Sequence, residues 1–435
     1  MCSSDLPRQS AKPDAALKRA IDLLRKAPLI DGHNDLPWVV RKACEGDIAS
    51  YDLTKLHPET DTDIPRLKAG MVNVQVLAAF LPSDIAHPAT VTLEQIDLIR
   101  RIEARHNDVF MPVRRSTDIA TAKRKGKIGS LISVEGTVGC EGSLAPIRVW
   151  HALGVRLVTL CHNGSLPWVD SSTDKPKADG LSPFGLTLIA ELNRLGIIID
   201  ASHASLAAAH AAIAASRAPI VLSHSNAHAL CPHPRNAPDD LIRAVAKSGG
   251  IVMATFVPSF INPDLLGQIT AWKRSRWPTD ATGPLAARTE PDPAEIVGAP
   301  EVTLAGFCSH VEHLLSVAGP DHVGIGSDFF GGRNPRGLDD AACFPALFAE
   351  LIRRGHGEQV LSRLAGANFM RVMRKVERIG RLIDKQLQPP AKARVRRASR
   401  RVAAAPSRLA TSAEVRASAG PTTRTTKRTT TGRTS

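Results

Sequence analysis

Short apolar runs recur along the chain, and each is followed by polar residues and then by a segment with helical periodicity. Runs of this length that are rich in β-branched residues are typical of buried strands, and their alternation with helices is typical of βα units. The pattern predicts eight strands, at residues 28–32, 71–80, 129–134, 155–161, 196–201, 219–223, 250–256 and 322–327. Eight strands with interposed helices favour an α/β fold, a parallel (β/α)8 barrel of the TIM-like type, over an open sheet.

Helical periodicity places the expected helices between or before these strands and after the last one. The segments between or before the strands are 14–26, 93–106, 147–153, 183–195, 204–216, 239–248 and 303–318, and those after the last strand are 344–354, 358–365 and 368–380. A single barrel domain is therefore expected over residues 14–380, preceded by a disordered segment at residues 1–13.

One long stretch, residues 258–301, shows no clear periodicity and contains seven prolines together with Trp272 and Trp277. Loops of this size in compact domains are usually lids, binding loops or disordered segments. Because the stretch follows the seventh predicted strand, it would lie over the mouth of a barrel, and we interpret it as a lid.

The formal net charge of +14 is concentrated at the C-terminal end of the chain. Residues 391–435 carry twelve Lys and Arg against the single Glu414, a net of +11, which leaves +3 for the rest of the chain. Residues 391–435 almost lack large apolar side chains, so we expect a disordered basic low-complexity tail, with bounds of 381–435. A solvated extension is favoured over an arm that binds anionic polymers, and no specific nucleic-acid partner is expected.

The competing class of function is a basic binding protein in which the barrel is incidental. In that case, salt-sensitive binding of nucleic acid would survive deletion of residues 391–435.

The cysteines and the apolar runs bear on the cellular compartment. The seven cysteines are odd in number and form no C-x-x-C pair, so neither a disulfide framework nor a cysteine zinc site is indicated. The chain has no apolar run of 18 residues, and residues 1–20 lack the apolar core of a signal peptide. We expect no membrane span and a cytoplasmic location by default, although an incorrectly assigned start would leave export open.

Candidate chemistry begins where the first predicted strand ends, at His33 and Asp35. Side chains at positions i and i+2 of a strand point to the same side, so this imidazole and this carboxylate can approach one ion. Zinc accepts both kinds of ligand. The pair alone would also fit a solvated loop, so its interpretation depends on partners elsewhere in the chain.

Such partners follow five more of the predicted strands. Glu135 follows the third strand, His162 the fourth, His203 the fifth, His224 the sixth and Asp328 the eighth. In a parallel barrel the carboxyl ends of all strands meet at one face, which is where catalytic groups lie. The sequence therefore predicts a cluster of metal-binding and acid–base residues at that face.

The motifs around these positions resemble those of the renal, or membrane, dipeptidase family. They are DGHNDLP (31–37), VEG (134–136), TLCHN (159–163), PW (167–168), GLSPFG (180–185), NRLGIIIDASH (193–203), SHS (223–225), PRN (234–236) and VGIGSDF (323–329). The resemblance implies a barrel of the metal-dependent hydrolase (amidohydrolase) type that holds two zinc ions per chain. It also implies a homodimer that hydrolyses the peptide bond of dipeptides through a metal-bridging hydroxide.

The resemblance also implies a metal ligand for each of five positions. His33 and Asp35 would bind one zinc ion, His203 and His224 the other, and Glu135 would bridge the two. With Glu135 counted for both ions, each ion has three protein ligands and keeps positions open for water and substrate.

Three further residues receive roles from the same resemblance, each with an alternative. Asp328 would relay a proton from the attacking water to the leaving amine, or would be a further metal ligand. His162 would donate a hydrogen bond to the developing oxyanion, or would only hold its loop. Arg235 would bind the C-terminal carboxylate of the dipeptide, or would be a surface charge. His228 and His233 lie near His224 in the sequence, but the motif supports only His224 as a ligand.

Two departures from the family pattern concern the substrate. Phe330 stands where the family commonly has a second Asp, and residues 255–258 lack the aromatic hydroxyl that some relatives carry, since Tyr51 is the only tyrosine. Neither change removes a proposed ligand, but both leave the side-chain preference open, including D-residues at the C-terminal side. The competing hypothesis is a related binuclear-zinc amidohydrolase that acts on another amide, an ester or a β-lactam.

Overall fold

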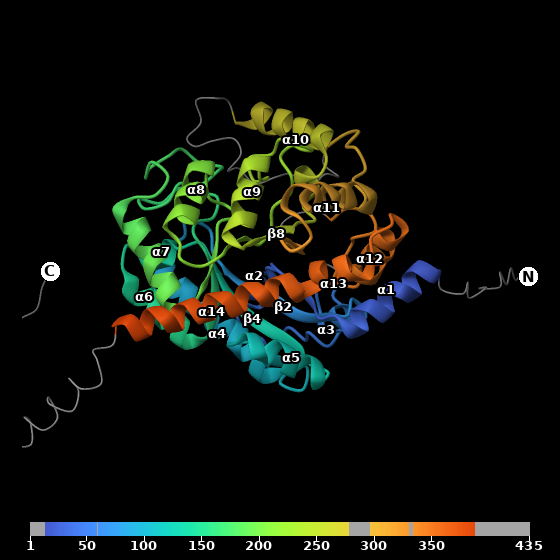
Figure 1. Cartoon of the computed structure of the whole chain (residues 1–435), viewed down its shortest axis with the longest axis horizontal. Coiled ribbons are helices and arrows are strands. Elements are labelled where there is room, and N and C mark those ends of the chain that lie inside the picture. The colour runs from blue at the N-terminus through green and yellow to red at the C-terminus, as the bar shows by residue number, and fades with distance from the viewer. Residues whose placement is uncertain (1–13, 59, 278–295, 330–333, 388–435) are drawn as a thin grey trace, which may run out of the picture. The chain divides into compact units, whose positions relative to one another are not determined.

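The computed structural model describes residues 14–58, 60–277, 296–329 and 334–387 (Figure 1). Its strands are β1 (Leu29–Asp31), β2 (Val72–Phe80), β3 (Phe110–Pro112), β4 (Ile128–Glu135), β5 (Val155–Thr159), β6 (Ile198–Asp200), β7 (Ile220–Leu222), β8 (Ile251–Ala254) and β9 (Val323–Ile325). Each of the eight predicted strands is present, with bounds that differ by a few residues.

The strands form one parallel sheet that closes on itself. The sheet order is β2-β1-β9-β8-β7-β6-β5-β4-β3, and a further pairing joins β2 to β4. Residues Val74 to Phe80 of β2 pair in register with Gly129 to Glu135 of β4, which closes a barrel of eight strands. The predicted (β/α)8 barrel is therefore confirmed.

The short strand β3 is the one strand that the sequence pattern did not predict. It pairs with β4 at residues 128–130, opposite the side on which β2 pairs with the same segment. β5 pairs with β4 only from Ile132 onward, so β3 fills the space beside β4 before β5 begins. With three residues, one of them a proline, β3 is too short to produce a recognisable alternation.

Helices surround the barrel between consecutive strands (Figure 1). Their bounds are α1 (Ala15–Lys26), α2 (Leu36–Cys44), α3 (Ile64–Ala69), α4 (Pro88–Arg105), α5 (Ser116–Arg124), α6 (Leu144–Leu153), α7 (Pro183–Leu195), α8 (Leu206–Ala215), α9 (Asp239–Ser248), α10 (Pro263–Arg276), α11 (Leu304–Ala318), α12 (Phe344–Arg353), α13 (Glu358–Ser362) and α14 (Asn368–Leu387). Of these, α2, α3, α5 and α10 were not predicted. No helix within the described ranges is both long and apolar enough to cross a bilayer.

The stretch expected to be irregular, residues 258–301, contains the helix α10. Asn262 caps this helix by accepting a hydrogen bond from the Leu265 amide at 2.9 Å, and Pro263 occupies its first turn. Asparagine followed by proline is a recognised signal for the start of a helix, so the sequence contained the information needed to predict α10. Residues 278–295 of the stretch lie outside the described residues, and its role as a lid stays a prediction.

The long helix α14 packs across the end of the barrel at which the strands begin. Its buried residues Phe369, Val372 and Val376 belong to the same apolar cluster as strand residues of the barrel such as Ile30. Gly380 contacts the backbone of Gly196, and Gly196 lies just before β6. The opposite end, where the strands finish, is therefore the end that remains for a site.

Helix α14 also changes the expected end of the domain. It continues past Gly380 to Leu387, so residues 381–387 belong to a helix and not to the tail. The expected disordered tail at 388–435 and the expected disordered segment at 1–13 lie outside the described residues.

Candidate active site

Every predicted site residue except Arg235, which lies in the loop between β7 and α9, lies at or just after the carboxyl end of a strand. Glu135 is the last residue of β4, and His33 and Asp35 follow β1. The remaining members follow β5, β6, β7 and β9, and they are His162, His203, His224 and Asp328. Parallel strands bring these positions to one face, so residues separated by up to about 300 positions meet there.

One group of atoms surrounds the imidazole of His33. Its Nε2 lies 3.4 Å from Glu135 Oε2, 3.7 Å from Asp35 Oδ2 and 3.8 Å from Asp328 Oδ1. The His33 side chain is completely buried, whereas those of Asp35 and Asp328 are 13% and 12% exposed. A buried imidazole nitrogen thus faces three carboxylates.

A second group surrounds the other oxygen of Glu135. Glu135 Oε1 lies 2.9 Å from His203 Nε2 and 3.6 Å from His224 Nε2. The two imidazole nitrogens are themselves 2.9 Å apart. Glu135 therefore lies between two sets of ligand atoms and presents one oxygen to each.

Three sets of side chains place one ligand atom each within 4.8 Å of the others. They are His33 with Asp35 and Glu135, Glu135 with His203 and His224, and His33 with His224 and Asp328. The first two sets match the ligand sets expected from the family resemblance. The third keeps Asp328 within reach of an ion, so its alternative role as a ligand is still compatible with the geometry.

Unpaired buried atoms indicate that the cluster fits metal ions. Within the described part of the chain, His33 Nε2, Asp35 Oδ1 and Glu135 Oε2 are buried and make no hydrogen bond. Such an orphaned group costs about 1–3 kcal/mol, more if it is charged, unless another partner binds it. Imidazole nitrogens and carboxylate oxygens are the ligand atoms that zinc prefers, so the donor set fits zinc.

The surroundings set the protonation states of three imidazole rings in the cluster. Burial lowers the pKa of His203 and of His224 well below the usual value for imidazole, so both rings are neutral. Burial alone would also lower the pKa of His33, but the carboxylates of Glu135 and Asp35 outweigh it and raise that pKa well above its usual value. In the absence of a metal, His33 therefore carries the positive charge of the cluster. A metal cation would take the place of that proton.

A hydrogen-bond network fixes the tautomer of His224. Asp200, a fully buried residue at the end of β6, accepts a hydrogen bond from Ser223 Oγ at 2.7 Å. Ser223 Oγ lies 2.8 Å from His224 Nδ1. Because the serine proton is directed at Asp200, Nδ1 of His224 must be the donor in this pair, which leaves the lone pair of Nε2 facing Glu135.

The ring of His162 forms one wall of the site. It meets Phe80 edge to face with ring centroids 4.8 Å apart, and its Nε2 lies 4.0 Å from Glu135 Oε1. Burial lowers the pKa of His162 to about 3, so the ring is neutral. Among the described residues its nitrogens make no hydrogen bond to the loop, and the side chain is 19% exposed. This geometry favours a role toward substrate over a role in holding the loop.

Arg235 is a buried residue, so its interpretation as a surface charge is wrong. It is 4% exposed, and its Nη2 donates a hydrogen bond to the His224 carbonyl at 3.2 Å. Its guanidinium carbon lies 5.6 Å from the centre of the Phe260 ring. Nη1 has no hydrogen-bond partner among the residues that the structure describes. A buried guanidinium with a free donor is suited to bind an anionic ligand group.

Asp328 is held in an unusual environment for a carboxyl group. Burial raises its pKa to about 7; His33 and Arg235 oppose this shift, whereas Asp35 and Glu135 add to it. A group with this pKa can both accept and release a proton near neutral pH.

Of the two departures from the family pattern, only the one at residues 255–258 falls within the described residues. Phe330 and residues 331–332 lie outside the described residues. Phe256, next to Thr255 at the end of β8, is fully buried and packs against Phe307 and Phe329 with ring centroids 4.8 and 5.5 Å away. Phe256 therefore belongs to the core and cannot take the place of a substrate-facing aromatic residue.

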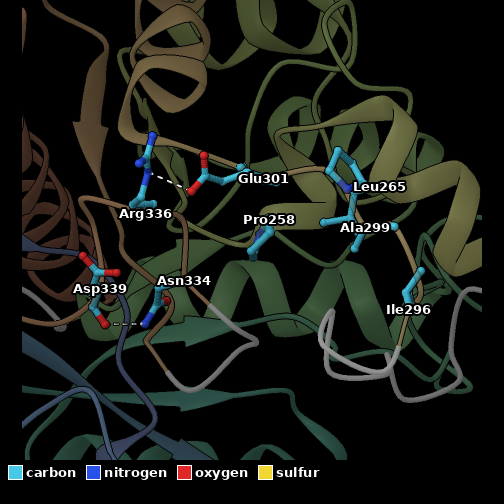
Figure 2. A pocket seen from close by; sticks show the side chains of 11 residues that line it. Pro258, Leu265, Ile296, Ala299, Glu301, Asn334, Arg336 and Asp339 are labelled. Carbon is cyan, nitrogen blue, oxygen red and sulfur yellow. Dashed lines mark hydrogen bonds and ion pairs between the residues drawn. The ribbon is translucent and has the colours of Figure 1, made fainter.

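A cavity of about 550 Å³ lies in the region that follows β8 and β9 (Figure 2). Its lining includes Pro258, Leu265 and Ile296, and Figure 2 shows the ion pair between Arg336 and Glu301 at its wall, with a distance of 2.8 Å. None of the predicted site residues lines it. The cavity is therefore distinct from the cluster around Glu135.

Sequence reasoning missed the buried residues that support the site. Asp31, Asp200, Ser223 and Ser327 form hydrogen bonds directly behind the predicted ligands and Asp328. All four lie inside the quoted motifs, one to three positions before site residues, and that position is the signal that could have identified them.

Comparisons with known proteins show the family to which the chain belongs. The model of membrane dipeptidases, peptidase family M19, matches residues 17–387. Dipeptidase verJ of Clonostachys rogersoniana is 34% identical over 380 residues, which cover 84% of this chain and 88% of that protein. The crystal structure of the probable dipeptidase PvdM from Pseudomonas aeruginosa is 25% identical, has a TM-score of 0.74, and covers 85% of this chain and 100% of that one. A metallo peptidase from Rhodobacter sphaeroides, liganded with a phosphinate mimic of the dipeptide L-Ala-D-Ala, shares the fold at 24% identity, with a TM-score of 0.67 over 80% of this chain and 99% of that one.

Proposed function

Because the chain belongs to the membrane dipeptidase family and is a metal-dependent hydrolase of the dipeptide peptide bond, we propose that it works with two zinc ions. The proposed ligands are His33 and Asp35 for one ion, His203 and His224 for the other, and Glu135 between them. The observation that carries this proposal is the position of Glu135, whose two oxygens face the two ligand sets separately. A homodimer stays a prediction from the family resemblance.

When bound, the ions would supply Lewis acidity, which polarises the scissile carbonyl and lowers the pKa of the attacking water. The residues of the chain supply the proton transfers and the orientation. Asp328 takes a proton from the water and delivers it to the leaving amine, for which a pKa of about 7 is suited. The neutral ring of His162 donates a hydrogen bond to the oxygen on which negative charge develops.

Arg235 binds the C-terminal carboxylate of the dipeptide in this proposal. Its buried guanidinium has no partner for Nη1 among the described residues, and its Nη2 donates a hydrogen bond to the carbonyl of His224, one of the proposed ligands. Carboxylates pair with guanidinium groups through two parallel hydrogen bonds. An arginine that binds the C-terminal carboxylate at this position therefore favours substrates that are two residues long. The neighbour that binds an L-Ala-D-Ala mimic supports including dipeptides with a C-terminal D-residue.

Replacement of the proposed clamp tests the substrate class. We expect Arg235→Met to raise KM for dipeptides by about 10- to 100-fold, because a charge-assisted hydrogen bond contributes about 1.5–3 kcal/mol. Steady-state kinetics with a free dipeptide and with its C-terminal amide measure the effect, and the variant should no longer distinguish the two substrates. Arg25→Met, an exposed arginine in α1, is the matched control. An unchanged KM for free dipeptides in Arg235→Met would show that the guanidinium does not bind the carboxylate.

A second candidate is a related amidohydrolase that acts on another amide or on a β-lactam. It is supported by the departures from the family pattern near the substrate, since Phe256 is buried and provides no hydroxyl. Turnover of a dipeptide panel measured beside N-acyl amino acids and a carbapenem separates the two functions. Dipeptides are expected to be the best substrates.

A further inference from the structure

Asp31 is a buried carboxylate that the proposed mechanism does not use. It is fully buried at the end of β1, and it belongs to none of the three ligand sets among the described residues. Its Oδ1 accepts a hydrogen bond from the Ser327 amide at 2.7 Å, and its Oδ2 accepts from Ser327 Oγ at 2.6 Å and from Gln75 Nε2 at 2.8 Å. A buried charge is tolerated only where hydrogen bonds satisfy it, and these three donors satisfy the Asp31 carboxylate.

The residue that follows Ser327 is Asp328, and its backbone conformation is unusual. Asp328 has φ of 61°, in the left-handed region that residues other than glycine rarely adopt. Its amide donates to the His33 carbonyl at 3.2 Å, and Ser327 Oγ lies 3.2 Å from the same carbonyl. Within the described part of the chain, the Asp328 carboxylate makes no hydrogen bond of its own. The position of the Asp328 carboxylate therefore depends on the backbone, and the hydrogen bonds of Ser327 hold that backbone in place.

The same arrangement occurs a second time in the barrel. Asp200 at the end of β6 accepts hydrogen bonds from the amide and the hydroxyl of Ser223, at 2.9 and 2.7 Å. Asp200 pairs with Val221 in the sheet, and Asp31 pairs with Ile325, so each serine lies two residues beyond the pairing partner of its aspartate. Each serine also directly precedes a site residue, His224 in one case and Asp328 in the other. Because the same contacts recur at equivalent register positions, they indicate that each Asp–Ser pair holds the site residue after the serine in place.

We propose that Asp31 is a positioning residue for the proton transfer, acting through Ser327 to hold the carboxylate of Asp328 beside the cluster. This inference rests on the proposed function, in which Asp328 moves the proton. The hydrogen bonds from Ser327 fix the strained turn, and the turn directs the Asp328 carboxylate to within 3.8 Å of His33 Nε2.

The first test removes the hydroxyl that Asp31 binds. We expect Ser327→Ala to lower kcat by about 10- to 100-fold, the effect typical of a residue that supports a site from behind, while KM changes less than about twofold and the metal content equals that of the parent. Ser327→Thr keeps a hydroxyl and should recover most of the lost kcat. Ser130→Ala is the matched control, because Ser130 is a buried serine of β4 whose hydroxyl has no hydrogen-bond partner among the described residues.

A double-mutant cycle with Asp328→Asn decides whether the effect passes through Asp328. If it does, Ser327→Ala changes the residual kcat of Asp328→Asn by less than about twofold. An undiminished kcat in Ser327→Ala, a loss of metal from it, or a full additional loss in the Asp328→Asn background would each overturn the proposal. If Ser327→Ala does not fold, Asp31→Asn is tested in the same cycle with the same criteria. An Asp328→Asn protein that keeps the parent kcat would instead refute the proposed function of Asp328 itself.

Discussion

Asp328→Asn is expected to lower kcat for dipeptide hydrolysis by about 100- to 10,000-fold, the range that a positioned general acid–base group contributes. The amide has nearly the shape of the carboxyl group but cannot accept and return a proton. We assign Asp328 this role because its Oδ1 lies 3.8 Å from His33 Nε2, beside the ligand cluster. Steady-state kinetics together with metal analysis of the same preparation measure the effect, and about two metal ions per chain should remain.

The metal content of this variant separates the two roles of Asp328. Because Asp328 lies within reach of His33 and His224, a loss of one ion in Asp328→Asn would identify it as a ligand. Asp321→Asn is the control for the same chemical change, since Asp321 is 57% exposed and precedes β9 at the other end of the barrel. It should leave both kcat and metal content unchanged.

Glu135→Gln is expected to abolish hydrolysis and to reduce the metal content from about two ions per chain to fewer than about one. Each oxygen of Glu135 faces a different set of ligands, at 3.4 Å from His33 Nε2 and 2.9 Å from His203 Nε2. The neutral amide has one oxygen and one NH2 group, so it cannot serve two cations. Metal analysis after dialysis and a dipeptide assay measure the two effects.

The number of ions lost by Glu135→Gln tests the bridging role in particular. Loss of a single ion, with the other retained at parent affinity, would mean that Glu135 is a ligand of one ion only. Glu141→Gln, which alters an exposed residue shortly after β4, is the control and should retain both ions and the parent activity.

The barrel could be predicted because the apolar runs that mark its strands are longer than the strands themselves. Strands β1, β6, β7 and β9 have only three residues each, yet each forms part of an apolar run that ends in a motif. The strand β3 is equally short and lacks such a motif, so it was missed. The seven prolines of 258–301 hide helix α10 from a reading of periodicity alone, although Asn262 and Pro263 mark its start.

The positions of the candidate metal ligands were predictable for a related reason, since each lies at or just after the end of a strand and the closed sheet brings strand ends together. The supporting residues were not, because their partners depend on the pairing of particular strands. Asp31 and Ser327 are 296 positions apart, and only the register between β1 and β9 places them in contact. The burial of Arg235 could likewise not be predicted from the sequence. It arises because the loop that carries Arg235 packs against Phe260 and His224.

We propose that a pair of zinc ions held by these residues enables the chain to hydrolyse dipeptides. The most direct measurement determines zinc per chain and dipeptide turnover on one preparation, before chelation, after chelation and after zinc is returned. We expect about two zinc ions per chain, loss of turnover with the chelator, and recovery when zinc is restored. Undiminished turnover by the metal-free protein, or no cleavage of any free dipeptide by the zinc-loaded protein, would contradict it.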